Sequence, residues 1–278
     1  MNDRVVFWSG CNVLRHGDIL HAAVDVMRAV GIEPAPVGGP GYCCGNPKDA
    51  NLRAAEGMAV RTVQKFNAAP EQEVVTWCPS CHRHMGSFMT QYQEPTFSFA
   101  HITQVLHARR ALLAERMTRR IERRVVPHQH FGFREVDVNP LVHDLLAVIP
   151  GIEVCRTEHA APGYMCSTLM PVPEAMRENT QRLCEVAQQT QADDVVTIFH
   201  SCQRLLCGLE ATEPFRVVNY ITLLAQGLGH EHVDEFKQWK NAGSADAVES
   251  MIGPDRIGRI GRDRLEQVLP DILRKPLR

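Results

Sequence analysis

The sequence has few of the features that mark nucleic-acid-binding, membrane-spanning or secreted proteins. Its 30 Lys and Arg residues are balanced by 32 Asp and Glu residues, and the net charge of −2 gives no reason to expect a nucleic acid partner. No run approaches the roughly 18 apolar residues of a spanning helix, so we expect no membrane span. Residues 1–8 lack the layout of a signal peptide. We therefore expect a cytoplasmic protein.

The cysteines of the first half of the chain fall into three segments. Cytoplasmic thiols are kept reduced, so clustered cysteines indicate a metal or redox site rather than disulfides. Cys43 and Cys44 lie in residues 41–47, where glycine and proline predict a loop. Cys11 precedes them and Cys78-Pro79-Ser80-Cys81 follows, which gives the spacing C-x31-C-C-x33-C-x2-C. Five thiols from three segments indicate one shared object, and thiolates are preferred ligands of soft metals and iron–sulfur clusters.

Apolar runs alternate with helical periodicity along the same half. Strands are predicted at 5–8, 33–37, 74–77 and 97–100, and helices at 18–30, 51–66, 82–92 and, as one long helix, from 101 onward. This alternation predicts α/β units around a largely parallel sheet. Cys11 and Cys78 follow predicted strands, so we expect both at the sheet edge where ligands gather in such folds.

The second half of the chain repeats the first at an offset of about 120 residues. Five segments recur in order: 5–6 at 125–126, 31–33 at 151–153, 40–45 at 162–167, 74–78 at 196–202 and 101–106 at 219–224. The repeat predicts an α/β protein of two pseudo-symmetric, Rossmann-like lobes with mainly parallel sheets. We place the lobes at 1–118 and 122–228, followed by a C-terminal helical extension at 229–278.

The possible explanations of the five thiols differ in how many of the thiols they account for. A thioredoxin-type dithiol at Cys78 and Cys81 leaves the other three unexplained. A tetrahedral zinc site needs four ligands, and adjacent cysteines reach one small ion poorly because consecutive side chains diverge. Chance core cysteines are favoured least. A multi-iron cluster accounts for the count best, since adjacent thiolates can reach different irons and a plain cubane needs only four.

The pattern C-x31-C-C-G-x32-C-x2-C resembles the cysteine-rich CCG domain found in the B subunit of heterodisulfide reductase. Related domains occur in iron–sulfur subunits of glycolate and lactate oxidation systems and in the heterodisulfide-reductase-like complex of sulfur oxidisers. The resemblance spans roughly residues 1–228. It implies one non-cubane [4Fe-4S] cluster, with an open iron site for a substrate sulfur and single-electron exchange with partner subunits. The ligands that it implies are Cys11, Cys43, Cys44, Cys78 and Cys81.

The second lobe lacks most of this signature, so we expect no second five-thiolate cluster. Met165 replaces the first residue of the Cys-Cys pair, and the position of Cys11 falls near His130 or Phe131. Cys166 is a candidate reactive thiol facing the pocket between the lobes. A different metal is the other candidate use, and a decayed lobe kept for packing is the simpler interpretation. The residues available for a metal are Cys166, Cys202, Cys207, His128, His130 and His200.

Three features outside the motif allow a structural interpretation. Residues 109–124 carry seven arginines and two glutamates, which predicts a solvated helix face or, alternatively, a basic surface for an acidic partner. Cys155 and Cys184 fall in apolar patterns and are interpreted as buried small hydrophobes. A C-terminal helix has one apolar face, which packs on its own core or on another subunit. That face comprises Leu265, Val268, Leu269, Ile272 and Leu273.

The resemblance therefore predicts a subunit of a thiol/disulfide-type oxidoreductase complex that performs disulfide or persulfide redox. The sequence contains neither the C-x2-C-x2-C-x3-C-P ferredoxin motif nor a G-x-G-x-x-G dinucleotide fingerprint. Electrons are thus expected to pass through a ferredoxin-like C subunit and a flavoprotein A subunit, with a sulfur-carrying substrate or carrier protein. The alternatives are a lactate or glycolate oxidation subunit and a non-catalytic electron-transfer or assembly module.

Overall fold

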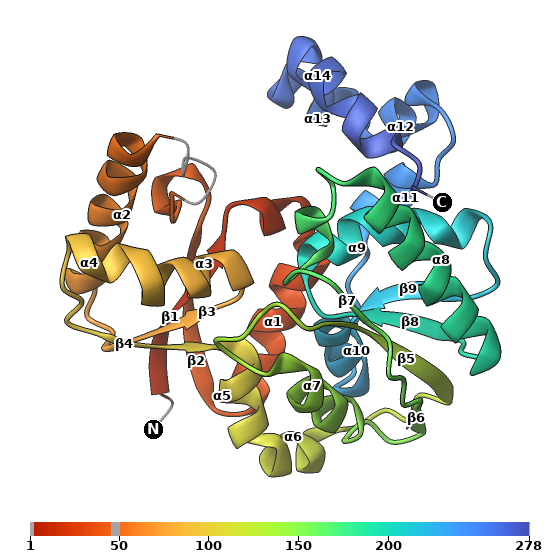
Figure 1. Cartoon of the computed structure of the whole chain (residues 1–278), viewed down its shortest axis with the longest axis horizontal. Coiled ribbons are helices and arrows are strands. Elements are labelled where there is room, and N and C mark those ends of the chain that lie inside the picture. The colour runs from red at the N-terminus through yellow and green to blue at the C-terminus, as the bar shows by residue number, and fades with distance from the viewer. Residues whose placement is uncertain (1–2, 46–50, 278) are drawn as a thin grey trace.

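The computed structural model describes residues 3–45 and 51–277. Figure 1 shows two α/β lobes side by side, with the C-terminal helices on the outer end of the second lobe. The end of the predicted Cys-Cys loop, Asn46 and Pro47, lies outside the described residues. In the part of the chain that is described, no helix has both the length and the apolar character needed to cross a membrane.

The first lobe is built on four parallel strands in the order β2-β1-β3-β4. The strands are β1 (Asp3–Gly10), β2 (Ile32–Gly38), β3 (Glu73–Thr76) and β4 (Ser98–His101). The helices are α1 (Gly17–Ala29), α2 (Leu52–Asn67), α3 (Pro79–His84), α4 (Thr90–Tyr92), α5 (Ile102–Ala108) and α6 (Arg110–Arg116), with the short turns η1 (Asn12–Arg15) and η2 (Pro40–Tyr42) and the π-helical η4 (Met85–Met89). The four predicted strands are confirmed.

Two of the predicted helices differ in extent. The helix predicted at 82–92 begins earlier, at Pro79, whose fixed φ suits the first helical position, and it contains the π-helical turn η4. The long helix predicted from His101 is wrong, because the chain breaks at Arg109 (φ −112°, ψ 17°) into α5 and α6. His101 itself caps α5 and accepts a hydrogen bond from the Thr103 backbone N–H.

The second lobe repeats this topology. Its parallel strands run in the order β6-β5-β8-β9, with the short β7 beside β5. The strands are β5 (Arg123–His130), β6 (Ile152–Val154), β7 (Ala160–Ala161), β8 (Asp194–Thr197) and β9 (Arg216–Asn219). The helices are α7 (Val138–Leu146), α8 (Pro173–Gln189), α9 (His200–Leu206) and α10 (Tyr220–Gly227), with the turns η5 (Cys166–Thr168) and η6 (Cys207–Ala211). The predicted fold of two pseudo-symmetric lobes with parallel sheets is confirmed.

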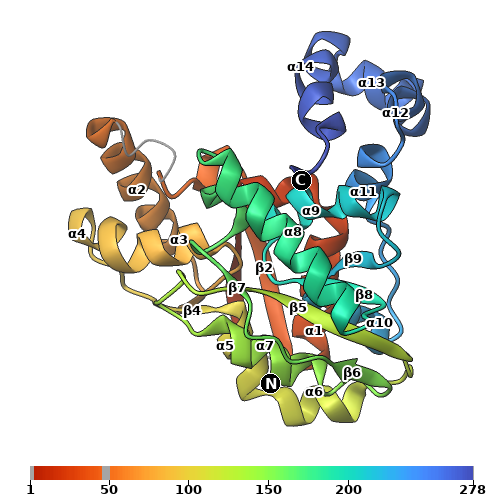
Figure 2. The ribbon, with the colours of Figure 1, turned by 45° about the vertical axis from the view of Figure 1, so that its right-hand side comes forward.

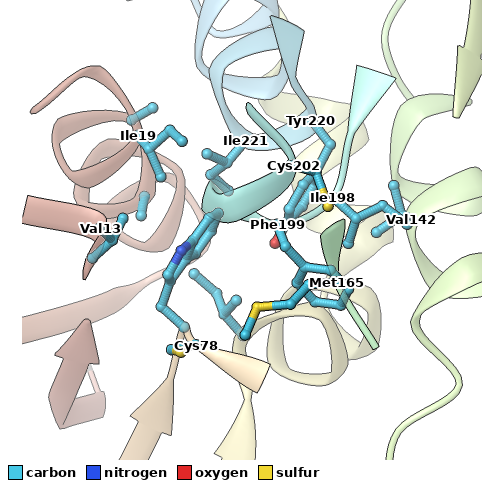
Figure 3. Close-up of a cluster of buried hydrophobic side chains, with 14 of the residues drawn as sticks. Val13, Ile19, Cys78, Val142, Met165, Ile198, Phe199, Cys202, Tyr220 and Ile221 are labelled. Carbon is cyan, nitrogen blue, oxygen red and sulfur yellow. The ribbon is translucent and has the colours of Figure 1, made fainter. Parts of the chain in front are cut away.

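The lobes meet through equivalent helices. α1 packs on α10, and α7 packs on α5, so each lobe gives the helix after its first strand and the helix after its last strand (Figure 2). Buried side chains of both lobes form one continuous core, including Val13, Cys78 and Phe199 (Figure 3). The rings of Trp77 and Tyr220 stack across this boundary with their centroids 5.9 Å apart. The relative position of the lobes is therefore fixed by packing.

The arginine-rich linker is a solvated segment with ion pairs. Arg109 pairs with Asp3, Arg119 pairs with Glu231, and the Arg124 guanidinium lies 3.3 Å from Glu153. Only residues 110–116 of the linker are helical, and residues 117–122 form neither helix nor strand before β5 begins. These contacts agree with the solvated interpretation rather than requiring an acidic partner.

The C-terminal extension is a group of four helices attached to the second lobe. They are α11 (Glu235–Lys240), α12 (Ala245–Ile252), α13 (Pro254–Ile260) and α14 (Arg262–Leu273). Leu265, Leu269 and Ile272 of α14 are buried where it packs on α11 and α13, whereas Val268 is 37% exposed. Most of the predicted apolar face thus belongs to the chain's own core.

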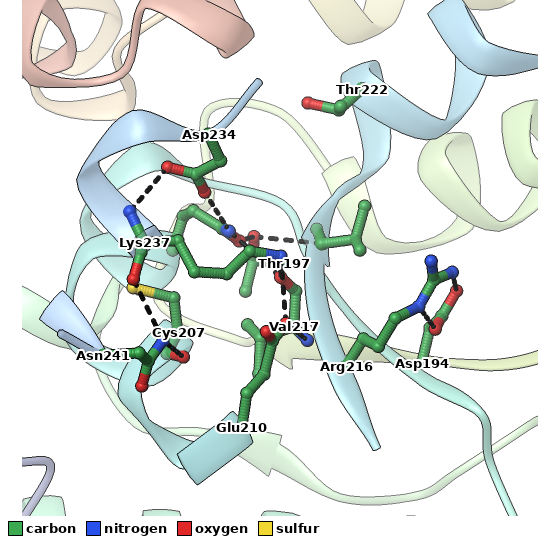
Figure 4. A network of polar contacts seen from close by, with 12 residues as sticks. Asp194, Thr197, Cys207, Glu210, Arg216, Val217, Thr222, Asp234, Lys237 and Asn241 are labelled. Atoms are coloured by element: carbon green, nitrogen blue, oxygen red, sulfur yellow. Dashed lines mark hydrogen bonds and ion pairs between the residues drawn. The ribbon is translucent and has the colours of Figure 1, made fainter. Parts of the chain in front are cut away.

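Polar contacts join α11 to the second lobe (Figure 4). The Lys237 ammonium donates to Glu210 at 2.9 Å and to the Val217 carbonyl at 3.2 Å. The Asn241 amide donates to the Cys207 carbonyl at 3.2 Å. Cys207 therefore lies beneath α11, in a structural role at the base of the extension.

Candidate metal centre

Parallel strand order brings the cysteines of the first lobe to one sheet edge. Cys11 directly follows β1, Cys78 lies two residues after β3 at the N-cap of α3, and Cys81 lies in that helix. Cys43 and Cys44 follow η2 at the same end of β2. Since β1 lies between β2 and β3, the three segments are neighbours. The prediction that Cys11 and Cys78 lie at one sheet edge agrees with the structure, and the other three cysteines lie in neighbouring segments at the same edge.

Glycine permits the close approach of these segments. Gly10 has φ +82°, and a Cβ added there would lie 3.1 Å from Cys78 Cβ and 3.2 Å from Cys81 Sγ. Gly45, at φ +86°, lies against α2, and its added Cβ would lie 2.9 Å from the Ala55 carbonyl oxygen. Both backbone conformations are costly for side chains other than glycine. The glycines thus set how closely the Cys-Cys loop and α3 approach the end of β1.

Three hydrogen bonds hold the Cys-Cys loop in place. Thr62 of α2 donates its hydroxyl to the Cys43 carbonyl at 3.0 Å. Trp8 of β1 donates its indole N–H to the Tyr42 carbonyl at 2.9 Å, and Lys65 donates to the Gly41 carbonyl at 2.6 Å. The loop backbone is therefore fixed by three side chains, while its two thiols remain directed to the cluster of cysteines.

The five thiols interact with one another. The hydrogen bond from Cys11 lowers the pKa of Cys43, and the same bond, together with burial, raises the pKa of Cys11. The hydrogen bond with Cys44 raises the pKa of Cys81, and the hydrogen bond from Cys81 lowers the pKa of Cys78. Neighbouring thiolates repel one another, so this set ionises completely only around a compensating cation. A multi-metal centre fits these donors.

The cysteine cluster opens into a pocket of about 200 Å³ between the lobes. The pocket therefore lies beside the thiols and has walls from both halves of the repeat. The first lobe contributes Cys11, Asn12, Cys44, Cys78, Ser80 and Cys81, and the second contributes Tyr164, Met165, Ser167, Thr168, His200, Ser201 and Arg204.

Polar groups of the second lobe line this pocket. The Trp77 indole N–H donates to His200 Nδ1 at 3.3 Å, which leaves the proton of the neutral imidazole on Nε2. Burial lowers the pKa of His200 to about 3, so the ring is neutral near pH 7. The buried Ser201 hydroxyl finds no hydrogen-bond partner among the residues that the structure describes. Ser80 donates to the Tyr164 hydroxyl at 3.4 Å across the pocket. The sequence predicted that the loop containing Tyr164 faces this pocket, but it did not predict Ser80, His200 and Ser201 as pocket walls.

Strand register corrects one correspondence in the repeat. Val6 pairs with Val74 in the first lobe, and Val126 pairs with Val195 in the second. Thr76 then matches Thr197, and Cys202 takes the place of Cys81. The sequence comparison had aligned residue 202 with residue 78. The threonines confirm the register, because each hydroxyl bonds the side chain six residues later, at 2.8 Å in both lobes.

The metal-binding candidates of the second lobe separate into two groups. Four lie together with their ligand atoms within 4.8 Å of one another: His128, His130, Cys166 and Cys202. The other two lie elsewhere: His200 lines the pocket, and Cys207 lies beneath α11. Cys166 is fully buried and is not among the residues that line the pocket, where its neighbour Met165 lies instead.

The fold and the thiol cluster together define a cysteine-rich α/β domain with a candidate metal centre. Residues 5–86, in the first lobe, match the family model described as a cysteine-rich domain, CCG. The resemblance drawn from the cysteine spacing is confirmed at this level. No curated protein matches the chain at a significant level.

Solved structures with a similar course of the chain include racemases. An aspartate racemase homologue from Pyrococcus horikoshii OT3 is 8% identical, with a TM-score of 0.37, and the match covers 81% of this chain and 97% of that chain. Allantoin racemase from Pseudomonas fluorescens is 14% identical, with a TM-score of 0.31 and coverage of 81% and 89%. Glutamate racemase from Aquifex pyrophilus is 13% identical, with a TM-score of 0.33 and coverage of 81% and 82%.

Proposed function

We propose that this chain is a cytoplasmic iron–sulfur subunit of a heterodisulfide-reductase-like oxidoreductase, with one non-cubane [4Fe-4S] cluster in its first lobe. The observation that carries the proposal is five interacting thiols at one sheet edge beside an interlobe pocket. The proposed ligands are Cys11, Cys43, Cys44, Cys78 and Cys81. Such a cluster supplies single electrons and an iron site that accepts a sulfur ligand.

The pocket residues fit a sulfur-containing substrate. Neutral His200 keeps its proton on Nε2, so this N–H can donate a hydrogen bond to a sulfur atom, and the Ser201 hydroxyl supplies a further hydrogen-bond donor. Met165 adds a soft thioether to the same wall. Reduction of a disulfide by two electrons gives two thiolates, which take their protons from solvent, and hydrogen-bond donors of this kind would stabilise the charge that develops on sulfur. The electrons come from partner chains, for which we propose the ferredoxin-like C subunit and the flavoprotein A subunit.

Iron chemistry and substrate response test this proposal separately. Protein purified without oxygen is expected to hold about four irons and about four acid-labile sulfides per chain. Addition of an organic disulfide or of cysteine persulfide is expected to change the EPR spectrum of the oxidised cluster. A content near eight irons, or zinc without sulfide in the first lobe, would refute the one-cluster assignment.

The same samples distinguish the alternatives. A cluster that takes up electrons but whose spectrum is unchanged by either sulfur compound would be an electron relay or assembly module. Reduction of the cluster by lactate or glycolate, in the presence of the subunits that are co-expressed with it, would place the chain in a lactate or glycolate oxidation system. His200→Ala is expected to weaken only the response to the sulfur compounds, because this residue is not among the proposed ligands.

A further inference from the structure

The second lobe contains four buried metal-ligand side chains on three segments. His128 and His130 lie two residues apart on β5, so their side chains share one face of the strand. Cys166 begins the turn η5, and Cys202 lies in the first turn of α9. None of the four is more than 2% exposed. Two imidazoles and two thiols that are buried against one another provide the donor set of a structural Cys2His2 zinc site.

The distances match a single ion. His128 Nε2 lies 3.1 Å from Cys166 Sγ, and His130 Nε2 lies 3.3 Å from Cys202 Sγ and 3.6 Å from Cys166 Sγ. Zinc bonds of about 2.3 Å to sulfur and about 2.0–2.1 Å to nitrogen place tetrahedral N and S ligands roughly 3.5 Å apart. In a Rieske [2Fe-2S] centre the histidines and cysteines bind different irons, so their donor atoms lie farther apart than these.

Outer contacts orient two of the ligands. His130 Nδ1 donates to the Pro162 carbonyl at 3.3 Å, which leaves the lone pair of Nε2 for a metal. The Cys166 backbone N–H donates to Cys202 Sγ at 3.4 Å. Two thiolates also neutralise a divalent ion, so the site buries no net charge. We propose that the second lobe binds one zinc ion through His128, His130, Cys166 and Cys202.

The proposed zinc would fix the second wall of the interlobe pocket. Cys166 turns into the site while the preceding Met165 faces the pocket, and Cys202 follows the pocket residues His200 and Ser201. One ion therefore joins the loop and the helix that face the cysteine cluster of the first lobe. This assignment does not depend on the proposed redox function, because it rests on the second lobe alone.

Metal analysis of the full chain, purified without oxygen, tests the proposal. We expect one zinc per chain beside the iron, and near-complete loss of zinc in His130→Ala and Cys202→Ser. Cys207→Ser is the matched control and is expected to retain zinc, since Cys207 lies beneath α11. Cys44→Ser is expected to lose iron and retain zinc, which separates this site from the first lobe.

Spectroscopy of the unaltered chain tests the site if the variants do not fold. Zinc-edge X-ray absorption is expected to show two sulfur and two nitrogen ligands, and cobalt-substituted protein the intense visible bands of a tetrahedral thiolate site. Zinc retained in both ligand variants would overturn the assignment. So would a wild-type chain in which the site holds iron, copper or no metal.

Discussion

At the scale of single residues, Gly10 determines whether the cysteine cluster can form. Its φ of +82° is strained for any other residue, and an added Cβ would lie only 3.2 Å from Cys81 Sγ, so a side chain here requires the neighbouring cysteines to shift. The nearest atoms belong to Cys78 and Cys81, so a displaced neighbour is also a displaced ligand candidate. A substitution here combines backbone strain with a change of cluster geometry.

Gly10→Ala is therefore expected to reduce the iron content and to destabilise the fold by about 1–3 kcal/mol. Iron analysis and urea unfolding check both effects. Gly57→Ala in α2 is the matched control, because no atom lies within 4 Å of its added Cβ. The control is expected to keep its iron and to gain about 0.5–1 kcal/mol from better helix propensity. Equal iron contents in the two variants would contradict the role given to Gly10.

Cys43→Ser and Cys44→Ser are expected to lose or convert the cluster, because oxygen is a harder donor than thiolate. Iron per chain should fall from about four to less than half that value, with a changed EPR spectrum. Cys184→Ser is the control, since Cys184 lies on α8 of the second lobe. If the control lost its iron while Cys44→Ser kept it, the ligand assignment would be wrong.

The sequence predicted the first cysteine set as one unit, whereas in the second lobe it named six metal candidates without showing which four lie together. Five thiols in three segments form a pattern that spacing alone displays, and the fold only had to place them at one edge. His128 and His130 were named as metal candidates, but their grouping with Cys166 and Cys202 depended on the register of β8 against β5. The signal for this site in the sequence was the pair of histidines at alternate positions, 128 and 130, of one strand. One residue of register decides which side chain faces the site.

At the scale of elements, periodicity predicted the strands and helices better than their ends. α1 and α2 begin and end within two residues of their predicted limits. The break between α5 and α6 was missed, because residues 101–116 contain neither glycine nor proline to mark it. Here the packing of α5 on α7 and of α6 on α1 decides where the helix ends. Local propensity is a weak guide where tertiary contacts compete with it.

The C-terminal helix α14 gives the prediction that belongs to this scale. Leu265 is 2% exposed between α11 and α13, so Leu265→Ala is expected to cost roughly 2–5 kcal/mol in the unfolding of the extension. Val268→Ala is the control on the exposed side of the same helix, with an expected change within about 0.5 kcal/mol. Urea unfolding combined with limited proteolysis measures both. Equal effects would show that the buried face does not pack on its own chain.

Docking on a partner subunit remains a prediction for the rest of the extension. Met251, Ile260 and Val268 are exposed apolar side chains on α12, α13 and α14. Deletion of residues 262–278 is expected to destabilise the extension as well as to weaken any association with a partner, because it removes Leu265. The point substitution Val268→Glu separates these effects, since it changes the surface without opening the core.

At the scale of the whole molecule, the repeat makes the function of one lobe depend on the other. The sequence predicted two lobes, and pseudo-symmetry predicted that the loop 162–167 lies at the strand ends of its own sheet and faces the pocket between the lobes. That this loop faces the cysteines of the first lobe follows from the packing of α1 on α10 and of α5 on α7. Such contacts between distant segments leave little trace in a single sequence. A buried acid at this junction provides a direct measurement of how tightly the lobes are held together.

Asp18 lies at the start of α1, 4% exposed, where the lobes meet. Thr222 of α10 donates a hydrogen bond to the Asp18 carboxylate at 3.4 Å. The charged or titratable groups around this carboxylate are Asp234 and Lys237, at α11, and the neighbouring His16. Burial, and then the charge of Asp234, raises the pKa of Asp18 to about 7. Protonated Asp18 therefore contributes to the free energy of unfolding. This contribution is complete below the pKa of about 4 that the carboxyl has in the unfolded chain, and it is lost as the pH rises through 7.

Asp18→Asn is therefore expected to gain stability relative to the wild type as the pH rises from 5.5 to 8.5. The difference in unfolding free energy should change by at most about 1.4 kcal/mol per pH unit and level off above the folded pKa. Urea unfolding of both proteins, each with its metals bound, gives this difference directly. Glu266→Gln on the exposed face of α14 is the control, because it also removes one carboxylate but lies outside the contact between α1 and α10. A flat profile for Asp18→Asn would show that water reaches this carboxyl and that the two lobes separate at α1.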